Sequence, residues 1–275
     1  EAAYTAAAQT IIAQLTEVAR TLTPTAGVTA LPPSPTEPAE PEQTETAPPV
    51  ATHTSTQLPP TETATSPPPT ATPTPTPTFP TGDPRLSLGE PDFYDNFATS
   101  ANWPLYEDDH VSFRINDETQ LIMIAFNPDQ WDGWMLTTPV ITNFYLEMIA
   151  RFRQCSGLDR FGLVFRAVPS DKGYLGYHFG VACDGRFSLR RWDGKNFIKL
   201  IDWTESTVLN AGSQQGNRIG VMANGNRFSL YANGVLLKEL TDDTHASGRF
   251  GVFVGSVNTP NFKVEVEEVS QWDLP

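Results

Sequence analysis

Arginine and aromatic residues recur at alternate positions in four short runs between residues 144 and 192. Alternate residues of an extended strand face opposite sides of a sheet. If the four runs pair in sequence order within one sheet, the alternation that buries Phe152, Phe165 and Phe179 turns the basic and aromatic residues to the opposite face. The residues of that face would be Arg151, Arg153, Arg166, Tyr174, His178, Arg190 and Trp192.

This combination of side chains suits the recognition of an acidic glycan. An arginine fork binds a carboxylate or a sulfate through two parallel hydrogen bonds, and a tyrosine or tryptophan ring stacks on the apolar face of a sugar. The alternative is that the arginines pair with cross-strand acids such as Glu147, or pack against another element. The spacing alone leaves both interpretations open.

A second aromatic candidate is the tetrapeptide Trp131-Asp132-Gly133-Trp134. Its tryptophans would serve either as a platform for a sugar ring or as a cap on the end of a hydrophobic core. The sequence favours the cap, because buried tryptophans more often have that role.

Catalytic patterns are absent from the sequence. A retaining glycosidase needs two carboxylates about 5 Å apart on one strand face. Glu265 and Glu267 share a face, with Glu268 beside them, but Lys263 and Gln271 flank them as on a solvated edge. The four histidines are scattered, and no Gly-x-Ser-x-Gly motif occurs. We therefore expect a protein that is not an enzyme.

Metal and cofactor sites are not predicted either. The acidic doublets Asp108-Asp109 and Asp242-Asp243 could supply oxygen ligands to Ca²⁺, but acidic loops are usually only solvated. The two cysteines, Cys155 and Cys183, form no Cys-x-x-Cys motif. In the four-strand arrangement they lie at the same end of the first and third strands, so we expect a structural disulfide in an exported protein. Two reduced buried cysteines are the alternative.

Charge disfavours anionic partners. The formal net charge is −14: residues 1–84 hold one arginine against eight acidic residues, and residues 85–275 hold 17 basic against 24 acidic residues. Nucleic acids and anionic membranes bind basic surfaces, so neither is an expected partner. No apolar run of about 18 residues occurs, so we expect membrane attachment only through a segment outside this sequence.

The first 23 residues predict an amphipathic helix. No proline or glycine interrupts them, and their apolar residues alternate at spacings of four and three, which is the seam of a coiled coil. The seam residues are Tyr4, Ala8, Ile11, Leu15, Val18 and Leu22. They predict self-association into a homo-oligomer or filament; the alternative is the remnant of a region next to a membrane anchor.

Residues 24–84 predict an extended stalk. Of the 25 prolines, 18 lie between Pro24 and Pro84, among many threonines. Such a composition cannot bury a core and favours polyproline II, and threonine beside proline is typical of O-glycosylated stalks. A plain flexible linker is the alternative.

Residues 85–275 predict an all-β head. Short runs with alternating apolar residues, such as 144–152 and 262–267, are separated by tight-turn dipeptides. The dipeptides are Asp184-Gly185, Asp193-Gly194, Asn224-Gly225 and Asn233-Gly234. This pattern indicates an antiparallel sandwich of two sheets.

The head also resembles a known family. Seven segments in this order are similar to those of the concanavalin A-like lectin/glucanase jelly rolls, including the LamG-type domains; they are 93–97, 162–166, 174–179, 186–192, 217–221, 230–234 and 246–253. The resemblance implies a jelly-roll sandwich, a fold that carries lectins, hydrolases and inert spacers. The Glu-x-Asp-x-x-Glu pattern of the family's laminarinase branch is absent. A helix, a stalk and such a head together resemble exported proteins of filamentous bacteria such as the Chloroflexota.

Two functions follow as expectations. The first is a non-enzymatic subunit of an extracellular filament or surface assembly, in which residues 1–23 self-associate and the stalk 24–84 displays the lectin-like head 85–275. The alternative is a carbohydrate-binding or adhesion module on a cell-surface stalk without a filament role. Self-association and carbohydrate binding are the partner interactions expected.

Overall fold

Short β-strands make up nearly all the regular structure of residues 79–275, the part of the chain that the computed structural model describes. One short 3₁₀ helix, η1 (Pro84–Leu86), precedes them. The predicted self-association seam and most of the predicted stalk lie outside the described residues. No helix in the described part is long and apolar enough to cross a membrane.

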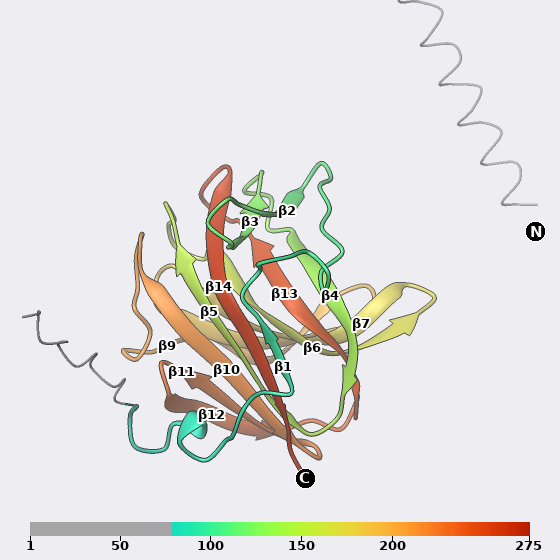
Figure 1. Cartoon of the computed structure of the whole chain (residues 1–275). Helices are drawn as coiled ribbons and strands as arrows, with labels where there is room; N and C mark the ends of the chain where they lie inside the picture. The colour runs from blue at the N-terminus through green and yellow to red at the C-terminus, as the bar shows by residue number, and fades with distance from the viewer. Residues whose placement is uncertain (1–78) are drawn as a thin grey trace, which may run out of the picture. The chain divides into compact units, whose positions relative to one another are not determined.

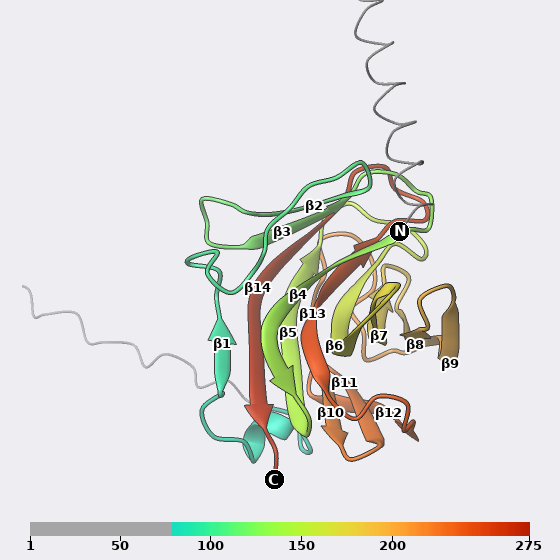
Figure 2. The same cartoon turned by 90° about the vertical axis from the view of Figure 1, so that its right-hand side faces the viewer.

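The strands form two antiparallel sheets that face each other (Figure 1). The eight-stranded sheet contains, in spatial order, β12 (Val235–Thr241), β11 (Arg227–Ala232), β10 (Gly216–Asn224), β5 (Phe144–Phe152), β14 (Phe262–Asp273), β3 (Leu121–Ala125) and β2 (Val111–Ile115), with β1 (Phe93–Asp95) paired to β14. The six-stranded sheet contains β4 (Asp132–Ile141), β13 (Gly248–Gly255), β6 (Arg160–Ser170), β7 (Gly173–Ala182), β8 (Arg186–Trp192) and β9 (Phe197–Glu205). Turned by 90°, Figure 2 shows β1 and β14 on one side and β7 to β9 on the other.

The core lies between the sheets, as the period-2 patterns require. Phe152 and Val264 of the eight-stranded sheet and Phe165 and Phe179 of the six-stranded sheet belong to one fully buried cluster. Burying such apolar area is the main driving force for this packing. The prediction of an all-β, two-sheet antiparallel sandwich is confirmed.

The predicted hairpin turns connect neighbouring strands. Gly185 lies between β7 and β8, Gly194 between β8 and β9, Gly225 between β10 and β11, and Gly234 between β11 and β12. All four have positive φ, between 57° and 89°, a region that glycine enters without steric cost.

The four-strand arrangement predicted for residues 144–192 is wrong in one respect. β5 does not pair with β6; it lies between β10 and β14 in the eight-stranded sheet, while β6, β7 and β8 are neighbours in the six-stranded sheet. The chain changes sheets after Phe152, so a face that includes residues of both β5 and β6 does not form.

Candidate ligand-binding site on the six-stranded sheet

Two of the predicted glycan-binding arginines lie on the other sheet. Arg151 is on β5 and Arg153 follows it, and each contacts an acid of β14: Arg153 Nε is 2.7 Å from Glu265 Oε1, and Arg151 Nη2 is 3.8 Å from Glu267 Oε1. The seven residues therefore do not share one face. These two arginines therefore pair with cross-strand acids, as the alternative interpretation predicted. Their partners are Glu267 and Glu265, not Glu147.

Arg166 is also displaced from the predicted face. A β-bulge in β6 gives it a φ of +48°, and its side chain is only 1% exposed. Its guanidinium donates to the carbonyl oxygens of Thr142, Gly225 and His245 at 2.7, 2.8 and 3.1 Å. Arg166 thus ties three connecting segments together and cannot reach a ligand at the surface.

The remaining four predicted residues, Tyr174, His178, Arg190 and Trp192, lie on the outer face of the six-stranded sheet. His178 and Arg190 are directly opposite each other on β7 and β8. Tyr174 lies farther along β7, where it packs beside a small apolar cluster and 5.5 Å from the Arg249 guanidinium.

A buried charge cluster holds this face together. Asp132, on β4, accepts hydrogen bonds from Arg160 Nε and from Arg190 Nη2, both at 2.7 Å, and the three residues are 6%, 5% and 9% exposed. The carboxylate is thereby fully paired, as a buried charge must be. Because one carboxylate faces two guanidiniums, the cluster carries one excess positive charge.

Aromatic rings stand over this cluster. Trp134 lies 6.1 Å from Trp192, Trp192 lies 4.9 Å from Phe197, and both Trp134 and Phe197 lie 4.9 Å from His178, measured between ring centroids. Phe197 also covers Arg190, whose guanidinium carbon is 4.4 Å from the ring centroid. The aromatic rings and the buried charge cluster therefore pack directly against each other.

These residues enclose a cavity of about 210 Å³. It is lined by Gln130, Trp131, Asp132, Trp134, Trp192 and Phe197. Trp131 is 55% exposed at its rim and stacks on His110 at 4.9 Å. Neither tryptophan of the 131–134 segment enters the core between the sheets; Trp134 packs against a small buried cluster on the outer face of the six-stranded sheet, and Trp131 is exposed.

Three buried polar atoms on β7 and β8 lack a hydrogen-bond partner among residues 79–275. They are His178 Nδ1, Ser188 Oγ and Arg190 Nε. Burial, and then the charge of Arg190, lowers the pKa of His178 to about 3, so this imidazole is neutral at physiological pH.

Asp132, Arg160 and Phe197 are residues of this site to which the sequence pattern assigned no role. The pattern of residues 131–134 indicates roles for Trp131 and Trp134 but none for the Asp132 carboxylate. The available signal was a charged residue between two large aromatics, because such an acid needs a cationic partner when the segment packs. The partners, Arg160 and Arg190, are distant in sequence and only the fold brings them near.

Solved structures with this arrangement of strands support the fold. A Bacillus subtilis protein of unknown function with a galectin-like fold superposes with a TM-score of 0.52 at 11% identity, over 67% of this chain and 96% of that one. The carbohydrate-binding module CBM66 from Bacillus subtilis gives 0.51 at 16% identity, over 62% and 96%. A Bacillus licheniformis β-glucanase gives 0.50 at 10% identity, over 68% and 99%. The described domain therefore has a jelly-roll fold like that of these structures. No protein-family model and no curated protein sequence matches the chain.

The acids of the C-terminal run serve other contacts in this jelly roll. Glu265 pairs with Arg153 and Lys263, and Glu268 accepts hydrogen bonds from Arg85 of η1 and from Ser270. In the aromatic cavity, Asp132 is the carboxylate of the lining, and both its oxygens are engaged by arginines. The described residues thus place no second carboxylate across this cavity from Asp132.

One aspartate of each acidic doublet considered for calcium is engaged as well. Asp108 accepts the backbone N–H groups of His110 and Val111, and Asp242 accepts from Tyr177 and Arg191. Within residues 79–275, no group of three or more histidine, cysteine or acidic residues could hold a metal ion.

The predicted disulfide is confirmed. Cys155, in the β5–β6 connection, is bonded to Cys183 at the β7–β8 turn, with 5.9 Å between their Cα atoms. The reason differs from the prediction, because β5 lies in the other sheet. The bond therefore links the connection between the sheets to one end of the six-stranded sheet.

Proposed function

We propose that the jelly roll is a non-catalytic carbohydrate-binding domain and that its ligand enters the aromatic cavity on the outer face of the six-stranded sheet. The observation that carries the proposal is the grouping of Trp131, Trp134, Trp192 and Phe197 around one cavity with the Asp132 carboxylate on its lining. Aromatic rings supply stacking surface, and a fixed polar group orients the hydroxyls of a sugar.

The size of the cavity indicates the scale of the ligand. Its volume of about 210 Å³ is below the ~300 Å³ at which enclosed small-molecule pockets usually begin. The cavity suits one sugar ring, with the rest of a glycan extending over the exposed ring of Trp131. The name of one fold neighbour, a carbohydrate-binding module, agrees with such a role.

The acidic-glycan hypothesis now involves fewer of the predicted residues. Trp192 and Tyr174 remain candidates for contact with a ligand on this face, whereas Arg151, Arg153 and Arg166 do not lie there. His178, which is 1% exposed, and Arg190, which Phe197 covers, lie too deep to contact a ligand and contribute only through their charge and packing. The excess positive charge of the Asp132 cluster supports a ligand with an acidic group, while Asp132 on the lining opposes one. The test therefore compares a neutral with an acidic polysaccharide.

Affinity gel electrophoresis of the full chain in laminarin and in polygalacturonate tests the proposal. Trp134→Ala and Trp192→Ala should each weaken binding by roughly an order of magnitude, which corresponds to about 1.4 kcal/mol. Leu236→Ala, at a 46% exposed position on β12, is the matched control. Near-ultraviolet circular dichroism checks the fold of each variant. Unchanged binding in both tryptophan variants would contradict the proposal.

We infer further that the protein lies at the cell surface or outside the cell and assembles there as a filament or surface layer. The Cys155–Cys183 disulfide supports an oxidising compartment. Assembly rests on the heptad spacing of residues 1–23, which lie outside the described residues. Replacing Ile11, Leu15 and Val18 by glutamine should abolish filaments or oligomers in negative-stain electron microscopy. If the wild-type protein is already monomeric, the adhesion module is the better description.

A further inference from the structure

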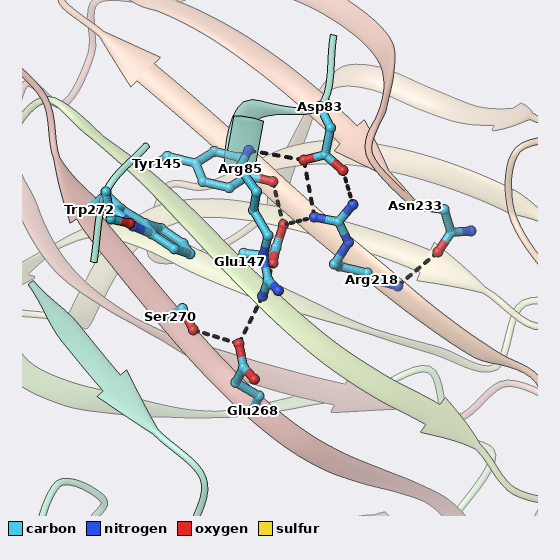
Figure 3. A network of polar contacts seen from close by, with 10 residues as sticks. Asp83, Arg85, Tyr145, Glu147, Arg218, Asn233, Glu268, Ser270 and Trp272 are labelled. Carbon is cyan, nitrogen blue, oxygen red and sulfur yellow. Dashed lines mark hydrogen bonds and ion pairs between the residues drawn. The ribbon is translucent and has the colours of Figure 1, made fainter. Parts of the chain in front are cut away.

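The segment 79–91, here called the leading segment, is fixed to the outer face of the eight-stranded sheet by ion pairs (Figure 3). Arg218, on β10, binds the Asp83 carboxylate, and its Nη1 is 2.8 Å from Glu147 Oε2. Arg85 also contacts Glu147, and its Nη2 is 2.8 Å from Glu268 Oε1 on β14. Two guanidiniums and three carboxylates thus join the leading segment to three strands.

Local structure holds this contact rigid. The Asp83 side chain also accepts the Arg85 backbone N–H at 3.0 Å and caps the short helix η1, in which Pro84 fixes the first turn. Farther along, the Trp272 indole N–H donates to the Gly89 carbonyl oxygen at 2.8 Å. The leading segment is therefore anchored at both of its ends.

The anchored segment forms one wall of a pocket of about 540 Å³. β14 supplies Glu268, Ser270 and Trp272, β1 supplies Tyr94, and the leading segment supplies Arg85 and Glu90. This volume lies within the ~300–1,000 Å³ of ordinary ligand sites. Tyr94 is 54% exposed, so its ring is accessible to a ligand.

We propose that this pocket is a second glycan site and that it takes a neutral sugar. The Tyr94 ring offers a stacking surface, and the half-buried pair of Arg85 and Glu268 offers a hydrogen-bond donor and an acceptor. Glu90 and Glu268 outnumber Arg85 on the lining, so a carboxylate or sulfate ligand meets like charge and must be desolvated at a net cost.

The position of the pocket makes the domain bivalent. The aromatic cavity lies on the outer face of the six-stranded sheet, and this pocket lies on the outer face of the eight-stranded sheet, across the sandwich core. Two polysaccharide chains bound on opposite faces would be cross-linked by one domain. The inference rests on the proposed function for the idea that the jelly roll binds glycans, but its residues are separate.

The experiment counts ligands bound to the full chain by native mass spectrometry, with β-1,3-glucan hexasaccharide as the neutral probe and hexagalacturonate as the acidic one. The wild-type chain should bind one neutral hexasaccharide at the Tyr94 site and one hexasaccharide, neutral or acidic, at the aromatic cavity. Tyr94→Ala and Trp134→Ala should each bind one, with the affinity of the remaining site unchanged within about twofold, and the double variant should bind none. Glu90→Lys should allow hexagalacturonate to bind at the Tyr94 site.

The possible results separate the two proposals. One neutral ligand per chain, lost in Trp134→Ala and retained in Tyr94→Ala, overturns the second site and leaves the proposed function. One neutral ligand lost only in Tyr94→Ala, with no hexagalacturonate bound to the wild-type chain, supports the second site and overturns the proposed cavity. Failure of the wild-type chain to bind either probe overturns both. Exposed Tyr94 contributes little to the core, so its variant remains folded.

Discussion

Arg218 on β10 and Glu147 on β5 form a nearly buried ion pair, with their side chains 14% and 2% exposed. Tyr145 donates a further hydrogen bond of 2.6 Å to the same Glu147 oxygen. Burial raises the pKa of Glu147, and the charges of Arg218 and Arg85 oppose that rise. The leading segment therefore docks through the Arg218–Glu147 ion pair, which stabilises the structure only while both side chains are charged.

Removal of the Arg218 guanidinium should be strongly destabilising. Arg218→Ala leaves the buried carboxylates of Asp83 and Glu147 without their shared partner, and breaking a buried pair costs about 3–5 kcal/mol. Arg227→Ala, which breaks the exposed pair with Glu239, should change the free energy of unfolding by less than about 1 kcal/mol. Urea unfolding measures both. Equal effects of the two substitutions would show that the network contributes little.

His178 should make the domain less stable in mild acid. Its pKa is about 3 in the folded state, against about 6.5 in an unfolded chain. Between these values the unfolded state binds the additional proton, so the stability is present above pH 6.5 and is lost as the pH falls toward 3. At pH 4.5 the loss from this group is about 2–3 kcal/mol relative to pH 7.

The measurement is urea unfolding at pH 7 and pH 4.5 for the wild type and His178→Phe. The variant removes the titration and the unpartnered Nδ1, so its stability should change less between the two pH values. A pH dependence as steep as that of the wild type would assign the acid sensitivity to other groups.

The disulfide should stabilise the domain by restricting the unfolded chain. Cys155 and Cys183 are separated by 28 residues, and closing a loop of this length corresponds to about 3–4 kcal/mol in the chain-entropy model. Cys155→Ala/Cys183→Ala should lower the free energy of unfolding by that amount. Dithiothreitol should then destabilise the wild type but not the double variant; equal sensitivity to the reductant would contradict this role.

Gly162 should not tolerate a side chain. A Cβ atom there would lie 2.0 Å from the Phe179 carbonyl oxygen and 2.5 Å from the Phe253 ring. Gly162→Ala should therefore cost at least about 1–3 kcal/mol through overpacking. Gly216→Ala is the control, because the nearest atom to its Cβ is a carbonyl oxygen at 3.9 Å. Thermal unfolding that affects both variants equally would show that the crowding at Gly162 is relieved elsewhere.

The strands and their turns could be predicted because their signals are local. Alternation along 144–152 and 262–267 and the turn at Gly194 depend on neighbouring residues only, and each appears in the structure at the expected place. The sheet that contains β5 could not be predicted in this way. Alternation is the same in either sheet, and the choice depends on pairing with β10 and β14, which are distant in sequence.

The candidate site likewise has features that follow from local sequence and features that depend on contacts between distant residues. The sequence by itself determined the all-β sandwich, because periodicity is a property of short stretches. It also named Trp134 and Trp192 as candidates and predicted the disulfide, but the strand arrangement from which it paired the cysteines does not form. Only the tertiary structure decided that Arg166 is buried, that Asp132 holds Arg160 and Arg190, and that Asp83 docks on Arg218. Each of these depends on the packing of a charge among residues far away in the chain, where the cost of desolvation permits only a partnered position.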